Sequence, residues 1–266
     1  MDIYNIQLPK GKRVPVLISS PHSGIGFPDE VKAGYWPEMI NPPCDTDFEM
    51  PELYNFASEL GITMISANLS RWVIDLNRDP ESAPLYNDGR LITGLCSMTT
   101  FEGEHIYRNE GPDDQEVQRR LETYYWPYYQ KVQELLDDLK AEFGHVLLYD
   151  LHSITRQVDA ISKDPFPDFV MGTADGSSCD ERLTKVMIDN FENSEYQFQL
   201  NHPFKGGHIT RYFGKPEKHQ HAIQLERSKD IYLDSEERHL DQEKIKSLRT
   251  LLKKNLEDLI KVTLSL

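Results

Sequence analysis

The 266-residue sequence predicts an α/β fold, because short apolar runs typical of strands alternate with amphipathic segments typical of helices. The strand-like runs lie at residues 14–20, 63–69, 146–151, 169–172 and 222–226. Helical periodicity occurs at residues 47–60, 113–143, 180–191 and 242–260, and we expect the last helix to pack across the sheet. Histidines at the ends of two strands fit this class, since open α/β sheets bind ligands at the carboxyl ends of their strands.

The first predicted strand, Val14–Ser20, leads into Pro21-His22-Ser23-Gly24, where small residues let a substrate approach. Two aspartates, Asp45 and Asp47, lie between this strand and the first predicted helix. They are the nearest carboxylates for a metal site that also uses histidines. Either aspartate also suits the N-cap of that helix, so both roles stay open at this point.

The second predicted strand precedes the segment Ser70–Pro80, in which Arg71 and Arg78 flank an apolar stretch and Asn77 adjoins Arg78. Guanidinium groups bind carboxylates at two points, and an asparagine amide can complete such a clamp. A surface cluster of salt bridges is the alternative interpretation. The following residues, 79–111, show no period and are predicted to form long loops above the sheet, where binding residues often lie.

In the predicted helix 113–143, Pro127 is expected to kink the helix or to restart it. The next strand closes on Asp150-Leu151-His152, which places His152 just past its end. Asp150 can orient the chain or hold the imidazole of His152 from behind. The pair of His22 and His152 predicts one metal ion held between two adjacent strands; two hydrogen-bonded histidines at sheet edges are the alternative.

The segment around Gly206-Gly207 allows close backbone approach and also supplies His208 and Arg211. His208 is a rival metal ligand, ranked below the other two because we expect it in a glycine-rich loop with no preceding strand. Three further histidines lie in a polar stretch that is predicted to be exposed: His202, His219 and His221.

Glu226 ends the last predicted strand. A glutamate that ends a buried strand is unusual unless it is paired or functional, so Glu226 is a candidate general base. A salt bridge from Glu226 to Arg227 or Lys229 is the alternative.

Composition narrows the class of protein. The balance of 44 acidic against 29 basic residues gives a net charge of −15, which argues against nucleic-acid binding. No stretch has the length of a membrane span, and the amino terminus lacks the features of a signal peptide. Three widely spaced cysteines indicate neither a disulfide framework nor a thiolate zinc site. A cytoplasmic location is therefore expected, while no feature specifies an oligomeric state.

Several motifs together resemble the N-formylglutamate amidohydrolase family, within the zinc carboxypeptidase and aspartoacylase superfamily. They extend from about residue 15 to residue 234, and their order makes the match specific. The motifs are Pro21-His22-Ser23-Gly24, Asp45-Thr46-Asp47, Ser70–Arg78, Thr93-Gly94-Leu95-Cys96, Thr100–Glu104, Asp150-Leu151-His152 and Gly206–Arg211, followed by the glutamate at the strand end.

This resemblance implies a three-layer α/β/α fold with a mixed central sheet, similar to the phosphorylase/hydrolase fold, with residues 1–266 as one catalytic domain. It implies hydrolysis of N-formyl-L-glutamate to formate and L-glutamate, late in a histidine-degradation route. The substrate is then a small anionic N-acyl amino acid. The implied cofactor is one divalent metal ion, zinc.

The resemblance also implies roles for individual residues. It implies that the metal ligands are His22, Asp47 and His152 and that Glu226 is the proton shuttle. It further implies that Arg71 stabilises the oxyanion and that the substrate carboxylates are bound by Asn77, Arg78 and Arg211. Arg71 and Arg211 can exchange roles. The superfamily commonly takes its metal carboxylate from a glutamate three residues after the first histidine, but that position is Ile25 here. Asp47 replaces it because it lies six residues before Leu53, as in the family's pattern; Asp45 remains the alternative.

Two other functions stay open. One is a related metal-dependent amidohydrolase acting on a different N-acyl amino acid, and the other is a non-catalytic carboxylate-binding protein. Intact Glu226 and both histidines argue against the second. A serine hydrolase is disfavoured, because the sequence has no G-x-S-x-G motif.

Overall fold

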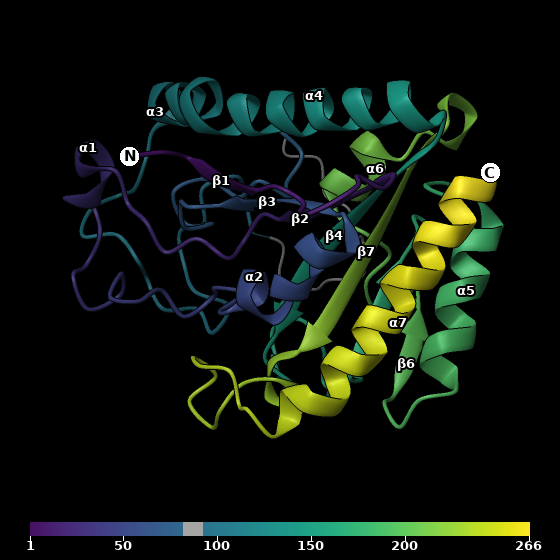
Figure 1. Ribbon diagram of the computed structural model, residues 1–266. Coiled ribbons are helices and arrows are strands. Elements are labelled where there is room, and N and C mark those ends of the chain that lie inside the picture. Colours follow the sequence, from purple (N-terminus) through teal and green to yellow (C-terminus); the bar gives the residue numbers. More distant parts are fainter. Residues whose placement is uncertain (82–92) are drawn as a thin grey trace.

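Seven strands form one sheet in the computed structural model, which describes residues 1–81 and 93–266 (Figure 1). Their spatial order is β1-β3-β2-β4-β7-β5-β6. The strands are β1 (Tyr4–Gln7), β2 (Val16–Ser20), β3 (Thr63–Ala67), β4 (Val146–Ile154), β5 (Phe169–Gly172), β6 (Phe198–Leu200) and β7 (Gln220–Ser228).

The centre of the sheet is parallel and its flanks are not. Strands β3, β2, β4 and β7 run in the same direction, whereas β1 pairs antiparallel with β3 and β5 pairs antiparallel with β7. The prediction of a mixed sheet is confirmed. Every residue of β2 and β4 is buried, which explains why these strands read as continuous apolar runs in the sequence.

Helices cover both faces of the sheet, so the molecule has three layers (Figure 1). Val146 and Leu148 of β4 pack into the core under α4, while Leu147 and Tyr149 pack into the core under α5 and α7. This alternation follows from the two-residue period of a strand. The helices on the first face are α3 (Asp114–Arg120), α4 (Trp126–Phe143) and α6 (His208–Phe213), and those on the second are α2 (Met50–Leu53), α5 (Glu181–Glu192) and α7 (Lys244–Ser265).

Two of the predicted helices are not single α-helices in the structure. Residues 47–60 form the short helix α2, which has Pro51 in its first turn, and then a 3₁₀-helix, η1 (Asn55–Leu60). Residues 113–143 form α3, one π-helical turn, η2 (Leu121–Tyr125), and then α4. Pro127 is the second residue of α4, just after the π-helical turn. The backbone at Tyr125 is helical, so the helix changes type before Pro127 and the predicted restart does not occur.

Some predicted bounds were wrong. Strand β4 continues to Ile154 and β7 to Ser228, so His152 and Glu226 lie within their strands and not at or beyond the ends. His208 begins helix α6 and is not in a loop. His221 is buried in β7, against the prediction that it is exposed. Unpredicted elements are β1, β6, α1 (Asp29–Lys32), α6, η3 (Pro216–Lys218) and η4 (Lys229–Ile231).

The long loops predicted over residues 79–111 lie partly outside the described residues. Within 93–111 the chain has no helix or strand, only isolated bridges such as Thr99 to His105 and Tyr35 to Tyr107. No helix among the described residues is long and apolar enough to cross a membrane.

Candidate active site

Three neighbouring strands bring the main candidate residues to one level of the sheet. Ser19 of β2 lies opposite Asp150 of β4, and His152 of β4 lies opposite Glu226 of β7. His22 follows the end of β2 by two residues, so it reaches the same level as His152. The expectation that two adjacent strands bring both histidines together is confirmed: the two Nδ1 atoms are 3.2 Å apart.

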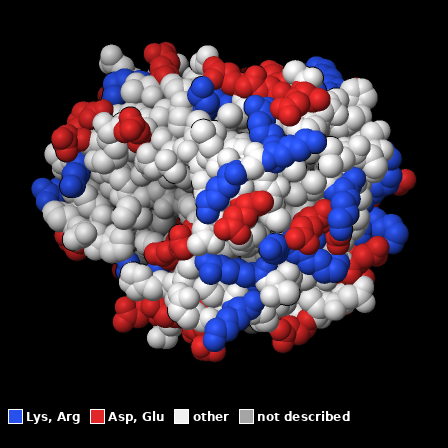
Figure 2. All heavy atoms as spheres, in the orientation of Figure 1, with Lys and Arg blue, Asp and Glu red and all other residues white. Residues whose placement is uncertain are grey.

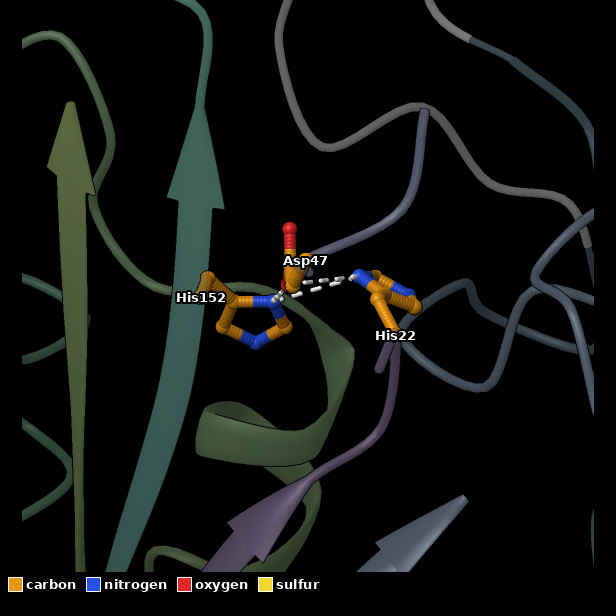
Figure 3. Close-up of side chains that lie close together, drawn as sticks. All are labelled: His22, Asp47 and His152. Carbon is orange, nitrogen blue, oxygen red and sulfur yellow. Dashed lines mark hydrogen bonds and ion pairs between the residues drawn. The ribbon is translucent and has the colours of Figure 1, made fainter. Parts of the chain in front are cut away.

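Asp47 completes a buried group with the two histidines (Figure 3). Its backbone N–H donates to the carbonyl oxygen of His22 at 2.9 Å, which holds the 45–48 segment against the end of β2. Asp47 Oδ2 lies 3.5 Å from His152 Nδ1 and 3.9 Å from His22 Nδ1. One ligand atom from each residue lies within 4.8 Å of the others, so this group can hold a metal ion.

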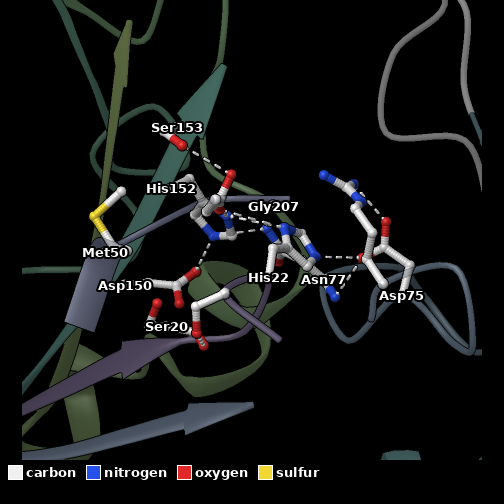
Figure 4. Close-up of polar contacts among 12 residues, drawn as sticks. Ser20, His22, Met50, Asp75, Asn77, Asp150, His152, Ser153 and Gly207 are labelled. Carbon is white, nitrogen blue, oxygen red and sulfur yellow. Dashed lines mark hydrogen bonds and ion pairs between the residues drawn. The ribbon is translucent and has the colours of Figure 1, made fainter. Parts of the chain in front are cut away.

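The far nitrogen of each imidazole binds a buried carboxylate (Figure 4). His22 Nε2 donates to Asp75 Oδ1 at 2.7 Å, and His152 Nε2 donates to Asp150 Oδ2 at 2.8 Å. These partners place an N–H on Nε2 of each ring and turn both Nδ1 atoms toward Asp47. Carboxylates behind ligand histidines orient the rings in the same way in metal sites. The predicted role of Asp150 behind His152 therefore agrees with the geometry.

The charge of the group also suits a cation. Asp47 Oδ1 accepts from Ser153 Oγ at 3.0 Å, but Oδ2 is buried and has no hydrogen-bond partner among the described residues. Burial and the neighbouring Arg71 lower the pKa of His22 to about 4. Burial also lowers the pKa of His152, but the carboxylates of Asp150, Asp47 and Glu226 together outweigh it and raise the value to about 10. The surrounding carboxylates thus favour positive charge at His152, and two imidazole nitrogens with one carboxylate oxygen are donors that suit zinc.

Asp45 is used differently from Asp47. Its Oδ2 accepts from Trp72 Nε1 at 3.1 Å and from the backbone N–H of Phe101 at 3.2 Å. The carboxylate of Asp45 therefore ties two loops together, while that of Asp47 faces the histidines. Neither aspartate caps a helix through its side chain, since the N-cap of α2 is Glu49.

Glu226 lies beside this group without a partner of its own. Its Oε1 is buried and has no hydrogen-bond partner among the described residues, and burial raises the pKa of its carboxyl to about 7. The alternative salt bridges are not formed. Arg227 Nη2 donates to the hydroxyl of Tyr54 at 2.8 Å, and Lys229 Nζ donates to the carbonyl oxygen of Cys44 at 3.2 Å.

The two arginines of the 70–80 segment share one carboxylate. Arg71 Nη2 donates to Asp75 Oδ2 at 2.6 Å, and its guanidinium lies over the ring of Phe101. Arg78 Nε lies 3.9 Å from the same oxygen and donates to the carbonyl oxygen of Thr93 at 2.9 Å. Both arginines therefore contact the buried Asp75, Arg71 as a buried residue and Arg78 as a partly exposed one, and they do not form a surface salt-bridge cluster.

Asn77 joins this segment to helix α6. Its Oδ1 accepts from the backbone N–H of Ile209 at 2.8 Å, and its Nδ2 lies 3.2 Å from His152 Nε2. A Cβ atom on Gly207 would lie 2.3 Å from Asn77 Nδ2, so the close approach that this glycine permits is to Asn77 (Figure 4). Arg211 lies on the exposed side of α6, and no hydrogen bond or ion pair in the described part of the chain joins it to the histidines.

Some residues of the site were not singled out from the sequence. Asp75 binds both His22 and Arg71, and Ser153 holds Asp47. Asp75 has a sequence signal, because it opens the Asp-Leu-Asn-Arg motif. Ser153 has a weaker one, because it only follows His152, and serines after histidines are common.

The fold and the site define a class: an α/β protein with a buried His–Asp–His group beside an unpaired glutamate, an arrangement typical of metal-dependent hydrolases. A family model described as N-formylglutamate amidohydrolase matches residues 14–233. The chain therefore belongs to the N-formylglutamate amidohydrolase family.

Relatives and solved structures agree with this assignment. An N-formylglutamate deformylase of Pseudomonas putida is 43% identical over 231 residues, which are 85% of this chain and 84% of that protein. One of Pseudomonas aeruginosa is 44% identical over 230 residues, 85% of each chain. A crystal structure of N-formylglutamate amidohydrolase from Ralstonia eutropha JMP134 superposes with a TM-score of 0.77 at 26% identity, covering 100% of this chain and 97% of that one.

Proposed function

We propose that this protein hydrolyses N-formyl-L-glutamate to formate and L-glutamate. The observation that carries the proposal is the His22–Asp47–His152 group, whose free Asp47 Oδ2 faces two Nδ1 atoms beside Glu226, in a chain of this family. The relatives at 43% and 44% identity are named for this deformylation. The place of the reaction late in histidine degradation belongs to the same proposal.

His22, Asp47 and His152 would hold one divalent ion, which we propose to be zinc. Three protein ligands leave a fourth position open, as in catalytic zinc sites. A bound ion of this kind lowers the pKa of a coordinated water to about 7 and polarises a carbonyl oxygen. Asp75 and Asp150 would keep the Nδ1 lone pair of each histidine directed at the ion.

Glu226 is the proposed general base and acid. It lies opposite His152 in the sheet, it is unpaired, and its raised pKa lets it take a proton from water and later deliver it to the leaving amine. The other carboxylates at this level have assigned partners in the proposal, because Asp75 and Asp150 each bind a histidine and Asp47 would bind the ion.

The arginines would bind the anionic parts of the substrate. Arg71 is buried beside Asp75 and lies close enough to Asp47 and Glu226 to influence the pKa of both, so we assign it to the oxyanion of the tetrahedral intermediate. Arg78 is the proposed anchor for a substrate carboxylate, with Asn77 and Arg211 contributing. The contacts of Asn77 suggest that it contributes mainly by holding the Arg78 segment against α6.

The direct test is formate release from N-formyl-L-glutamate, with and without a chelator and after zinc is added back. We expect activity that the chelator abolishes and zinc restores. N-formyl-L-glutamine is the matched substrate, since it keeps the α-carboxylate and loses only the side-chain charge. Equal kcat/KM for both substrates would favour a hydrolase with broader N-acyl amino acid specificity, and binding of L-glutamate without any hydrolysis would leave a carboxylate-binding protein.

A further inference from the structure

The helical segment from residue 120 to residue 129 holds the loop that carries Arg71, Asn77 and Arg78. Three of its side chains donate to three backbone carbonyls of that loop. Arg120 Nη1 donates to Val73 O at 2.9 Å, the Tyr129 hydroxyl to Leu76 O at 2.7 Å, and the Tyr125 hydroxyl to Arg78 O at 2.8 Å. All three donors are buried, and Tyr125 is 0% exposed.

The π-helical turn η2 lets both Arg120 and Tyr125 reach the loop. In an α-helix, residues five apart point about 140° away from each other, so Arg120 and Tyr125 would face different directions. A π-turn closes its hydrogen bonds between residues five apart and places them one above the other. Leu121–Tyr125 is such a turn, and Arg120 and Tyr125 both reach the loop. Tyr129, four residues after Tyr125, stacks on it with ring centroids 4.3 Å apart.

The carbonyl held by Tyr125 belongs to Arg78 itself. Holding that carbonyl fixes the peptide plane after Arg78, which restricts the backbone from which the side chain leaves. Thr93 then holds the guanidinium, since Nε donates to Thr93 O and Nη2 to Thr93 Oγ1, both at 2.9 Å. Because both its backbone carbonyl and its guanidinium are held by hydrogen bonds, Arg78 is preorganised for a two-point contact with a carboxylate.

The geometry points to Tyr125 as a positioning residue for Arg78: its hydroxyl, placed by the π-turn, aims the guanidinium that binds the substrate carboxylate. The inference rests on the proposed function, in which Arg78 binds that carboxylate. Tyr125 does not touch the reacting atoms, because its hydroxyl is committed to Arg78 O.

Tyr125→Phe tests the inference, because it removes the hydroxyl and keeps the stack on Tyr129. We expect KM for N-formyl-L-glutamate to rise about fivefold to tenfold, the effect of one lost hydrogen bond, with kcat within about twofold. Zinc content should be unchanged. The matched control is Tyr128→Phe on the same helix, whose buried hydroxyl contacts Ser19 Oγ and not the loop; its KM should stay at the parent value.

A double-mutant cycle separates an effect of Tyr125 through Arg78 from a general increase in the mobility of the loop. If Tyr125 acts through Arg78, its substitution should change KM little in an Arg78→Ala background. An equal effect in both backgrounds, or an unchanged KM in Tyr125→Phe alone, would overturn the inference.

An inactive parent enzyme would instead contradict the proposed function. The positioning claim is then decided by the crystal structure of Tyr125→Phe. There, the Arg78 guanidinium leaves Thr93 if the inference is right and keeps both contacts if it is wrong.

Discussion

Asp47 divides its carboxylate between the protein and the proposed metal: Ser153 holds Oδ1, and Oδ2 faces the histidines. The sequence places Asp45 and Asp47 two positions apart and offers no reason to choose between them except the family's pattern. What distinguishes them is tertiary, because Asp45 accepts from the indole of Trp72. Residue types at strand ends therefore predict the candidates, whereas their individual roles depend on partners far away in the chain.

Replacing Asp47 tests this division. Asp47→Asn should lose most of its metal, because it removes the only anionic ligand of the three, while Asp45→Asn is the matched control and should keep it. Metal per protein chain, measured by atomic emission after dialysis, gives the comparison. The reverse result would move the ligand to Asp45.

Replacing Glu226 separates proton transfer from metal binding. Glu226→Gln keeps the shape and should keep the metal, but kcat should fall by about 10²–10⁴-fold, the usual contribution of general acid–base catalysis. Steady-state formate release and metal content are measured on the same preparation. Near-normal turnover would require a different base.

At the scale of elements, the central strands were predictable and the connections were less so. Strands β2, β4 and β7 are fully or nearly fully buried, so their apolar runs stand out. The ends of β4 and β7 were missed because His152 and Glu226 are polar residues inside strands. The two edge strands, β1 and β6, have only four and three residues, and α6 has six, too few for a clear period. The π-turn has no sequence signal that we recognise.

A histidine pair at the start of two strands makes stability depend on pH. His145, just before β4, has its Nδ1 3.4 Å from Nε2 of His221 in β7, and the backbone N–H of Asp180 donates to His221 Nδ1. Burial, and then His145, lower the pKa of His221 from 6.5 to about 4. The other charged and titratable groups that influence it are the Asp180 carboxylate, His219 and Arg182.

His221 stays neutral in the folded protein down to about pH 4, whereas in the unfolded chain it takes up a proton below its ordinary pKa of 6.5. The contribution of His221 to the free energy of unfolding is therefore complete above pH 6.5 and decreases as the pH falls towards 4. His221→Asn keeps an acceptor for Asp180 and does not titrate, so its unfolding free energy should decline less over that range. Urea unfolding at several pH values measures the slope. The exposed His239→Asn is the control. Parallel slopes for His221→Asn and the parent would contradict the assignment.

At the scale of the whole molecule, the net charge of −15 does not form a patch of one sign on the face shown in Figure 2, where basic and acidic side chains alternate. We therefore expect an anionic substrate to be recognised by Arg71 and Arg78 within the site and not by the surface field. Length and the alternation of elements were sufficient to predict the class of fold, and the charge argues against nucleic-acid binding. The order of the strands was not predictable, because it depends on pairings between distant segments.

Removing the metal should lower the stability of the molecule without unfolding it. An ion that binds only the folded state stabilises it by mass action, and hydrophobic cores on both faces of the sheet remain when the ion is gone. We expect a lower Tm after chelation, an unchanged far-ultraviolet circular dichroism spectrum, and a Tm that rises with added zinc. The Asp47→Asn variant should show no such rise, and a full response in it would place the stabilising ion elsewhere.

The proposed ligands come from three separate parts of the chain, and His22 and His152 are 130 positions apart. As the ribosome releases the chain from its amino terminus, His22 and Asp47 emerge long before the strand that carries His152. The three proposed ligands can meet only after β4 has been synthesised and has paired with β2. If the proposed metal site is right, a nascent or truncated chain that ends before β4 therefore has no complete site with which to bind the ion.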